Sequence, residues 1–253
     1  MAPSPRPVAL VTGASAGLGR EFCRQLAASG YDLVLVARGE ERLIDLAADL
    51  AARHGVSCDV LTADLTRDAD VDRVVARIDR APLDLLVNNA GFGTRGSLAR
   101  TSREGQEQML RVHVLAVHRL TQAALQGMVP RGRGAIITVA SVASYLTSPG
   151  NVNYTATKAW QRVFSESLAL ELAGTGVYVQ VLCPGYTHTE FHERAGIDKR
   201  TSASWIWMRA ERVVASSLRS LARRRPVVVV PGWGYRVAVL LLRFLPRWSW
   251  RHA

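Results

Sequence analysis

Tyr154 and Lys158 lie four residues apart in the segment Y-T-A-T-K, and Ser141 lies thirteen residues before the tyrosine. On a helix, residues i and i+4 share one face, so the phenol and the ammonium would lie side by side. A tyrosine with its ordinary pKa of about 10 is a poor acid–base group at neutral pH, and a neighbouring ammonium lowers that pKa. Such a tyrosine can pass a proton to the oxyanion that hydride transfer to a carbonyl leaves, while a serine hydroxyl orients the carbonyl oxygen.

Each of these residues also fits an ordinary structural role. The tyrosine could be packed, the lysine solvated on its helix, and the serine a cap at the end of a strand. Lys158 is, however, one of only two lysines in a chain with thirty arginines, the other being Lys199. Arginine does not replace lysine where a compact and tunable ammonium is required. The retained lysine therefore favours the catalytic interpretation.

A glycine-rich turn follows the first apolar run of the chain. Residues 8–12 read VALVT, and TGASAGLG then places glycines at Gly13, Gly17 and Gly19 before a helical pattern. A glycine turn that opens a helix lets the backbone approach a pyrophosphate, whose charge the helix N-terminus stabilises. Glycines also end strands for purely steric reasons, but the strand–turn–helix order favours a dinucleotide site. The turn residues expected at the cofactor are Gly13, Ser15, Ala16, Gly17, Leu18 and Gly19.

The end of the second expected strand indicates which nucleotide binds. An acidic residue there would accept hydrogen bonds from the ribose 2′-hydroxyl of NAD, but this strand closes with Ala37 and Arg38. Arg38 can pair with a 2′-phosphate, and Arg42, one helical turn further on, can assist. Both arginines would also suit a solvated helix start. Because the acid is missing and a base is present, the sequence favours NADP(H).

Further cofactor contacts are expected where the third and fourth strands end. Asp64 and Leu65 close the third strand and would lie beside the adenine. The fourth strand runs into Asn89, Ala90 and Gly91, which would border the cofactor. In open parallel sheets ligands bind beyond the carboxyl ends of the strands, so all of these positions belong to one edge.

Apolar runs alternate with helical patterns along most of the chain. Strands are expected at 8–12, 31–38, 57–65, 83–91, 134–141, 177–185 and 226–230, and helices at 19–29, 40–54, 68–79, 104–128 and 154–173. Strands that are apolar on both faces and alternate with helices predict a single-domain α/β Rossmann fold. Its doubly wound parallel sheet would have about seven strands with helices on both faces. We expect a flexible tail at 1–7, the domain at 8–232 with a substrate lid at about 191–212, and an extension at 233–253.

Taken together, the motifs resemble those of the classical short-chain dehydrogenase/reductase family. The resemblance spans about residues 8–191 and rests on TGASAGLG, NNAG, Ser141 with YTATK, and CPGYTHT at 183–189. It implies that Tyr154 is the general acid, that Ser141 steadies the substrate carbonyl, and that Lys158 binds the nicotinamide ribose and lowers the pKa of the tyrosine. It also implies homodimers or homotetramers through the helices that start near Glu104 and Tyr154. The residues that would border the nicotinamide are Pro184, Gly185, Thr187 and Thr189.

One position departs from the family pattern. Where the family has an asparagine that holds a water in the proton relay behind the lysine, this chain has His113, in Val112-His113-Val114. Histidine can donate or accept a hydrogen bond and titrates near neutrality, so it could take the place of the asparagine in catalysis. It could equally pack in the core while the proton returns by another route.

Composition excludes several classes of protein. Of the 253 residues, 48% are hydrophobic, which excludes intrinsic disorder. Three widely spaced cysteines fit neither a disulfide framework nor a zinc site, so no metal is expected. The sequence shows no secretory signal and no apolar stretch of about 20 residues, so the expected compartment is the cytoplasm. Nucleic acid is not an expected partner, because the chain carries no recognised binding motif.

The net charge of +11 is concentrated near the C-terminus. Residues 204–253 hold ten arginines, no lysine, one acidic residue and five of the six tryptophans. Arg236 and Arg243 are seven residues apart and share a helical face, which fits a helix lying on anionic lipid at the inner membrane surface, or one packed at a subunit interface. The aromatic segment SASWIWM (202–208) would suit a lid over a hydrophobic substrate, or an ordinary packed helix.

This tail is similar to that of reductases acting on long-chain 3-oxo lipids, including 3-ketoacyl and mycolate-type reductases. The sequence thus predicts an NADP(H)-dependent oxidoreductase that transfers a hydride between nicotinamide and a carbonyl or secondary alcohol of a hydrophobic or 3-oxoacyl lipid. Two alternatives remain open at this point. One is a soluble reductase of small ketones and aldehydes, and the other is a non-catalytic NADP-binding regulatory protein.

Overall fold

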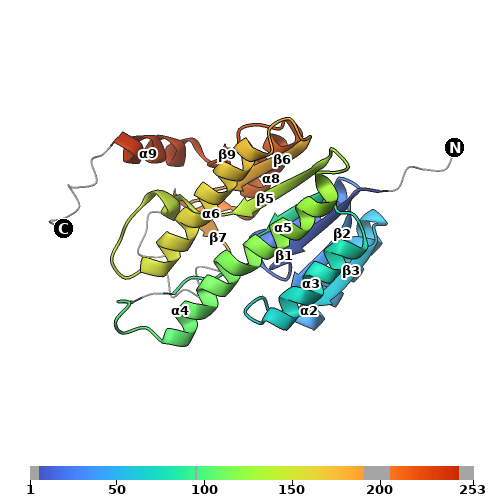
Figure 1. The fold of residues 1–253 in the computed structure, drawn as a ribbon, viewed down its shortest axis with the longest axis horizontal. Helices are drawn as coiled ribbons and strands as arrows, with labels where there is room; N and C mark the ends of the chain where they lie inside the picture. The colour runs from blue at the N-terminus through green and yellow to red at the C-terminus, as the bar shows by residue number, and fades with distance from the viewer. Residues whose placement is uncertain (1–5, 95, 191–205, 245–253) are drawn as a thin grey trace.

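The computed structural model describes residues 6–94, 96–190 and 206–244, and its core is one parallel sheet (Figure 1). The strands pair in the order β3-β2-β1-β4-β5-β6-β9, and every pairing is parallel. They are β1 (Val8–Thr12), β2 (Asp32–Ala37), β3 (Cys58–Thr62), β4 (Leu85–Asn88), β5 (Gly134–Val139), β6 (Val177–Leu182) and β9 (Val228–Val229). The order reverses between β1 and β4, and this reversal is where parallel sheets bind ligands.

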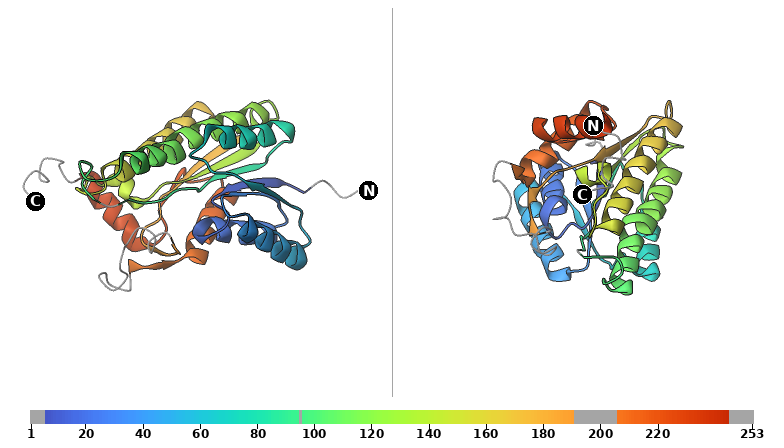
Figure 2. Two further views of the ribbon diagram at one scale, coloured as in Figure 1. Left: turned by 90° about the horizontal axis from the view of Figure 1, so that it is seen from below. Right: turned by 90° about the vertical axis from the view of Figure 1, so that its left-hand side faces the viewer.

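Helices cover both faces of the sheet (Figure 2). One face carries α1 (Gly17–Ala28), α2 (Glu40–His54) and α8 (Ala210–Ala222), whose buried side chains share one apolar cluster with the sheet. The other face carries α3 (Asp68–Arg80), α5 (Val117–Met128) and α6 (Val152–Glu171), which share a second cluster. The predicted single-domain Rossmann architecture is confirmed. Burial on both faces explains why the strands read as continuous apolar runs.

Six of the seven strands end earlier than the sequence pattern predicted, all but β1, and side-chain hydrogen bonds follow the ends of β4 and β3. β4 stops at Asn88 because the next amide, of Asn89, donates to the side-chain hydroxyl of Thr12 (2.9 Å) instead of to a backbone carbonyl of a neighbouring strand. β3 stops at Thr62, and the chain then turns where the carboxylate of Asp70 accepts from the Asp64 amide (2.9 Å). Both early endings release backbone at the edge of the sheet where the site lies.

The helix expected over 104–128 has three parts. It begins as α4 (Arg103–Leu110), passes through a π-helical turn (Arg111–Ala116) and continues as α5. Ser102 caps its start, since the Ser102 hydroxyl accepts from the Gly105 amide (2.9 Å). Such π-helical turns are rare and are frequently found at functional sites. Here the turn contains His113 at its centre.

The C-terminal part is described only from residue 206 to 244. The expected lid over 191–212 therefore lies mostly outside the described residues. Its last part forms β8 (Met208–Arg209), which pairs with β7 (Thr187–His188), and the start of α8. The helix α9 (Trp233–Phe244) follows β9. Most of the expected N-terminal tail (1–5) and the end of the expected C-terminal extension (245–253) also lie outside the described residues. The latter segment contains Arg247, Arg251 and two tryptophans.

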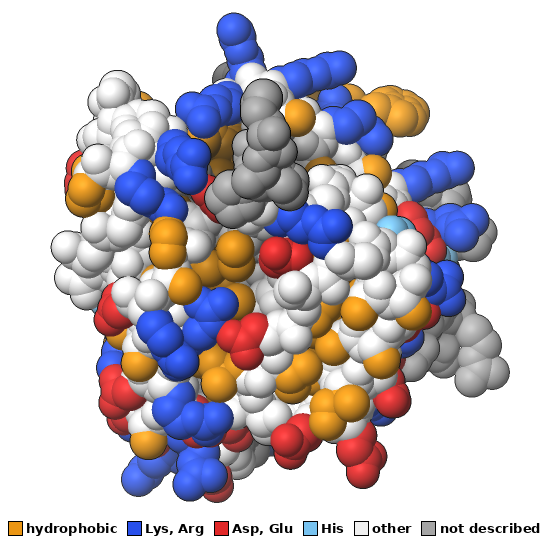
Figure 3. Space-filling view, turned by 90° about the vertical axis from the view of Figure 1, so that its right-hand side faces the viewer, with side chains coloured by type: hydrophobic (Ala, Val, Ile, Leu, Met, Phe, Trp, Pro, Cys, Tyr) orange, Lys and Arg blue, Asp and Glu red, His pale blue; other side chains and the backbone are white. Residues whose placement is uncertain are grey.

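Two features of the described chain bear on partners. No helix among the described residues is long and apolar enough to cross a membrane. On the face beside the N-terminal segment, acidic and basic side chains are interspersed (Figure 3). The net positive charge of the chain is thus not gathered into one basic surface on this face.

Candidate active site

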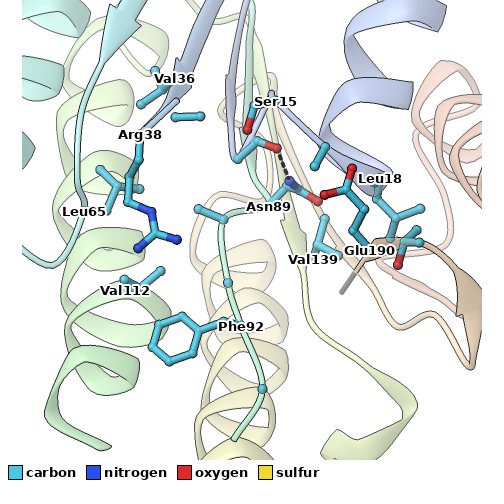
Figure 4. A pocket seen from close by; sticks show the side chains of 18 of the residues that line it. Ser15, Leu18, Val36, Arg38, Leu65, Asn89, Phe92, Val112, Val139 and Glu190 are labelled. Carbon is cyan, nitrogen blue, oxygen red and sulfur yellow. Dashed lines mark hydrogen bonds between the residues drawn. The ribbon is translucent and has the colours of Figure 1, made fainter. Parts of the chain in front are cut away.

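A pocket of about 610 Å³ opens at the carboxyl ends of the strands (Figure 4). Its size is in the range typical of small-molecule and cofactor sites. All residues that the sequence analysis assigned to cofactor or catalysis line it, except Gly19 and His113. Those that line it are Gly13, Ser15, Ala16, Gly17, Leu18, Arg38, Arg42, Asp64, Leu65, Asn89, Ala90, Gly91, Ser141, Tyr154, Lys158, Pro184, Gly185, Thr187 and Thr189.

The glycine turn brings the start of α1 against the ends of β1 and β4. Gly13 and Gly17 adopt left-handed backbone conformations, with φ of +67° and +54°. Gly19 does not face the pocket, but a Cβ there would lie 2.2 Å from the carbonyl oxygen of Gly13, so its role is close packing of helix and turn. No side chain caps the start of α1, so its first N–H groups can receive an anion.

Thr12, which the sequence analysis did not single out, holds the two central strand ends together. Its hydroxyl accepts from the amides of Asn89 (2.9 Å) and Ala90 (3.0 Å). The Asn89 side chain in turn donates to the carbonyl oxygen of Thr12 (2.8 Å). The available signal was a polar residue closing the apolar run VALVT. These bonds fix the floor of the pocket between the glycine turn and Ala90.

Arg38 projects from the end of β2 into the pocket (Figure 4). The strand β2 is followed by Arg38 and Gly39, and the first carboxylates after it, Glu40 and Glu41 on the first turn of α2, do not line the pocket. Arg42, on the first turn of α2, forms an exposed ion pair with Glu190 (3.3 Å). Glu190 was not predicted from the sequence, because it lies 148 residues away from its partner. The two arginines thus differ: one points into the pocket, and the other already has a carboxylate partner.

Ser141 and Tyr154 meet at one wall of the pocket. Ser141 follows β5 and begins a short 3-10 helix, where its hydroxyl accepts from the Ala143 amide (3.1 Å). Burial raises the pKa of Tyr154 to about 12, and a hydrogen bond with the Ser141 side chain acts in the opposite direction. The phenol of Tyr154 is therefore protonated at neutral pH.

Lys158 lies one helical turn beyond Tyr154, and its Nζ is 5.9 Å from the centre of the phenol ring. The ammonium donates to the carbonyl oxygen of Val139 (2.8 Å) and to Oε1 of Gln161 (2.9 Å). Burial lowers the pKa of Lys158 to about 7, and Cys183 has a smaller effect in the opposite direction. An ammonium that is this deeply buried, and that titrates near neutrality, is typical of functional sites.

His113 is buried outside the pocket lining. Its Nε2 accepts from the Phe92 amide (3.1 Å), and its Nδ1 lies 2.9 Å from the hydroxyl of Thr157. Since that hydroxyl donates to the carbonyl oxygen of Tyr154, the imidazole is the donor in the second contact. Burial and the nearby Lys158 hold the pKa of His113 well below its usual value, so the ring is neutral. The hydrogen bonds of the ring lead to Phe92 and Thr157 and not to the lysine.

The part of the pocket wall formed by Gly185 is held in place by a residue that the sequence analysis missed. Tyr235, on α9, stacks so closely on Gly185 that a Cβ at Gly185 would lie 2.1 Å from its ring. Its hydroxyl accepts from the Tyr186 amide (3.0 Å) and donates to the carbonyl oxygen of Ile206 (2.8 Å). The C-terminal helix thereby fixes the segment after β6. Within the described residues, no group of three or more His, Cys, Asp or Glu side chains could hold a metal ion.

Comparison with known proteins agrees with this class of fold and site. The model of the family described as short chain dehydrogenase matches residues 7–200. The chain belongs to the short-chain dehydrogenase/reductase family of oxidoreductases. It is similar to gluconate 5-dehydrogenase of Gluconobacter oxydans, with 36% identity over 83% of this chain and 85% of that protein.

Two further similar proteins are informative in different ways, because the name of one states a substrate and the name of the other a cofactor. The very-long-chain 3-oxoacyl-CoA reductase of Pyrenophora tritici-repentis is 36% identical over 68% of this chain and 52% of that protein, so the chain matches about half of its length. The solved structure of a short-chain dehydrogenase from Sphingobium yanoikuyae in complex with NADPH has a TM-score of 0.87 and 36% identity. That match covers 95% of this chain and 96% of the other.

Proposed function

We propose that this protein is an NADP(H)-dependent oxidoreductase that interconverts a carbonyl and a secondary alcohol. The observation that carries the proposal is the wall of the pocket at which Ser141, Tyr154 and Lys158 come together, opposite a glycine turn that can receive a pyrophosphate. The residues present fit a dinucleotide, because α1 has an uncapped N-terminus and the turn is left-handed at Gly13 and Gly17. When bound, the nicotinamide supplies or accepts the hydride.

The side chains at this wall have separate roles in the proposal. The Ser141 hydroxyl donates a hydrogen bond to the carbonyl oxygen and orients it. Tyr154 gives its proton to that oxygen as negative charge develops there. Lys158 contributes a positive charge beside the phenol, which favours the phenolate and so makes the proton easier to transfer. The same ammonium is placed to hold the nicotinamide ribose, with Pro184, Gly185, Thr187 and Thr189 bordering the nicotinamide.

The preference for NADP(H) rests on the residues around the expected ribose. Arg38 lines the pocket, whereas the usual acidic partner of a ribose 2′-hydroxyl is missing at the end of β2. Arg42 can add to the positive charge there, although it shares its charge with Glu190. The similar protein from Sphingobium yanoikuyae was solved with NADPH, which supports the same cofactor for this chain.

We expect Arg38→Asp to shift the cofactor preference from NADPH toward NADH by about 100-fold or more. One charge-assisted hydrogen bond contributes about 1.5–3 kcal/mol, each 1.4 kcal/mol is about tenfold in affinity, and the new carboxylate would also repel a 2′-phosphate. The measurement is paired titration of both nucleotides, followed by their fluorescence, on the wild type and the variant. Arg53→Asp makes the same charge change at an exposed site outside the pocket and should leave the preference unaltered.

Equal weakening of both nucleotides by Arg38→Asp would contradict a contact to the 2′-phosphate while leaving the dinucleotide site intact. If the wild type binds neither nucleotide, the proposed oxidoreductase function itself fails.

The substrate we propose is hydrophobic, such as a long-chain 3-oxoacyl or other lipid ketone. Phe92 and Val112 line the pocket, and an aromatic group borders the strand pair β7–β8. In that group the Trp207 ring lies 5.2 Å from both the Tyr186 and the His188 rings. The relative named as a very-long-chain 3-oxoacyl-CoA reductase supports this substrate class. Small ketones or aldehydes are the alternative, and comparing kcat/KM across an acyl-chain series separates the two.

We further propose that α9 contacts an anionic lipid surface. Trp233, Val237, Leu240 and Leu241 recur at helical spacing and are exposed, the tryptophan to 81%. Their apolar side chains form one stripe, and the surrounding C-terminal sequence is rich in arginine. An amphipathic helix of this kind lies in the interface of a membrane and does not span it.

The protein should therefore float with vesicles of phosphatidylcholine and phosphatidylglycerol, and less with phosphatidylcholine alone. The double variant Trp233→Gln/Leu241→Gln should remain unbound, because it removes exposed apolar area and spares Tyr235 and the pocket. Failure of the wild type to float would favour the alternative in which α9 packs at a subunit interface.

The described structure also suggests a surface through which copies of the chain could assemble. Exposed apolar side chains follow the outer surfaces of the long helix pair on one face of the sheet, including Leu110, Leu115, Val163 and Leu170, the last exposed to 80%. Helix faces of this kind are covered when two copies pack together. We propose a homodimer or homotetramer through α4, α5 and α6, in the cytoplasm or at the inner membrane surface, with residues 8–232 as the catalytic domain.

A further inference from the structure

A buried glutamine links the catalytic lysine to the π-helical turn. Gln161 lies on α6, three residues after Lys158, and is only 1% exposed. Its Oε1 accepts from the Lys158 ammonium (2.9 Å), and its Nε2 donates to the carbonyl oxygen of His113 (2.9 Å). Both ends of the amide are therefore used, one by each partner.

These partners fix the orientation of the amide. An ammonium can only donate hydrogen bonds, and a backbone carbonyl can only accept them. If the amide were rotated by half a turn, its NH₂ group would face the ammonium and its oxygen would face the carbonyl oxygen, and both hydrogen bonds would be lost. The carbonyl of His113 is itself held in place, because the ring of the same residue is bonded to Phe92 and Thr157. The amide thus carries a rigid connection from the π-helical turn to the ammonium.

We propose that Gln161 is a positioning residue that anchors the Lys158 ammonium directly to the π-helical turn. This inference rests on the proposed function, because only there does the position of Lys158 matter for turnover. The family resemblance places an asparagine-held water behind the lysine. In this chain the amide of Gln161 makes both contacts itself, which accounts for a histidine at position 113: the backbone carbonyl, and not the side chain, is what the link requires.

The surroundings of Lys158 make the glutamine important for its charge. The titratable groups that face it are Tyr154 on the same helix, Cys183 after β6 and His113 on the π-helical turn. All three are uncharged at neutral pH, since burial raises the pKa of Cys183 to about 11 and of Tyr154 to about 12 and keeps His113 neutral. The ammonium is therefore stabilised by dipoles, those of the Val139 carbonyl and the Gln161 amide.

The test reads the ionisation of Lys158 directly. The chain has only two lysines, so a protein labelled with lysine ¹³C at Cε gives two signals, and Lys199→Arg leaves Lys158 alone. In this background the cofactor-free protein is titrated by NMR. Gln161→Met, which keeps the length and loses the acceptor, should lower the pKa of Lys158 by about one unit, since it removes one hydrogen bond to a charged group. Gln161→Glu should raise that pKa by more than about one unit, because it places a carboxylate at the ammonium.

Gln180→Met is the matched control. Gln180 is also buried, but its amide bonds to Ser217, on the other side of β6 from the site. This variant should leave the titration of Lys158 where it is in the parent protein. A titration that coincides in parent, Gln161→Met and Gln161→Glu would overturn the proposal. The opposite signs of the two variants keep the test decisive even where one of them folds poorly.

The NMR titration of Lys158 tests the positioning role separately from the proposed catalytic activity. A protein in which both variants move the Lys158 titration as expected, but which reduces no carbonyl, would retain the positioning role and reject the proposed activity. A protein that is active and whose Lys158 titration ignores Gln161 would do the reverse.

Discussion

Tyr154→Phe is expected to lower kcat for carbonyl reduction by about 10³-fold, while the affinity for NADPH changes by less than about twofold. General acid catalysis contributes about 10²–10⁴ to a rate, and the variant removes the only atom of Tyr154 that carries the transferable proton. The ring that remains keeps its edge contact with the His113 ring, whose centre lies 6.1 Å away. The glycine turn and Arg38 are untouched, so nucleotide binding should persist.

The measurement is NADPH oxidation with a panel of 3-oxoacyl and lipid ketones, together with fluorescence titration of the nucleotide. Tyr178→Phe is the matched control, because it also removes a single phenolic oxygen, one that donates to the carbonyl oxygen of Pro226 (2.8 Å) away from the pocket. It should retain wild-type turnover.

Two outcomes would go against the expectation. Retained turnover in Tyr154→Phe would assign the proton to another group. A wild type that binds NADPH tightly but reduces none of the carbonyls would favour the non-catalytic regulatory protein. An intact set of Ser141, Tyr154 and Lys158 argues against that alternative, since nucleotide binding alone has no need of the phenolic proton.

The parts of this fold that follow from local sequence are the ones that the sequence predicted well. The strands at 8–12 and 177–182 are buried on both faces. A continuous run of mostly apolar residues predicts such burial, and the run can be recognised from the five or six residues of the strand alone. Gly55 ends α2 in a left-handed conformation (φ +64°), as the pattern of a helix stopped by glycine predicts. The glycine turn and the Tyr154–Lys158 pair were likewise readable, because their partners lie within a few residues.

Contacts between distant segments were not readable in the same way. Arg42 meets Glu190, and Tyr235 covers Gly185, across separations that no local pattern encodes. The π-helical turn was also missed, since the apolar periodicity of 104–128 fits one uninterrupted helix. Gln161 is the clearest example: a single glutamine within a helical segment is a weak signal by itself, and its meaning depends on the carbonyl of His113.

Lys158→Met is expected to flatten the pH dependence of stability. Burial lowers the pKa of Lys158 from 10.5 to about 7, so between these pH values the unfolded chain binds a proton that the folded chain does not. Stability rises with pH wherever the unfolded state binds more protons. The free energy of unfolding of the wild type should therefore rise relative to the variant by about 1.4 kcal/mol per pH unit in this window, on the order of 5 kcal/mol in total.

Below pH 7 both states of the wild type carry the proton, so the difference between wild type and variant should be constant there. Urea unfolding of both proteins from pH 6 to 10 measures the difference at each pH, and other titrating groups cancel because the two chains share them. Lys199→Met, which removes the only other lysine, controls for the loss of a lysine charge as such. If the unfolding free energies of wild type and Lys158→Met changed with pH in parallel, the pKa of Lys158 would be the same in the folded and unfolded states, and the expectation would be wrong.

A slope of the expected sign would mean that the fold tolerates an unfavourable buried ammonium at neutral pH. The Val139 carbonyl and the Gln161 amide offset only part of that cost, since the pKa of Lys158 remains far below its ordinary value. A buried charge with a strongly shifted pKa is typical of functional positions, where stability is traded for activity. In the proposed function that reason is its place beside Tyr154, where a positive charge would make the phenolic proton available.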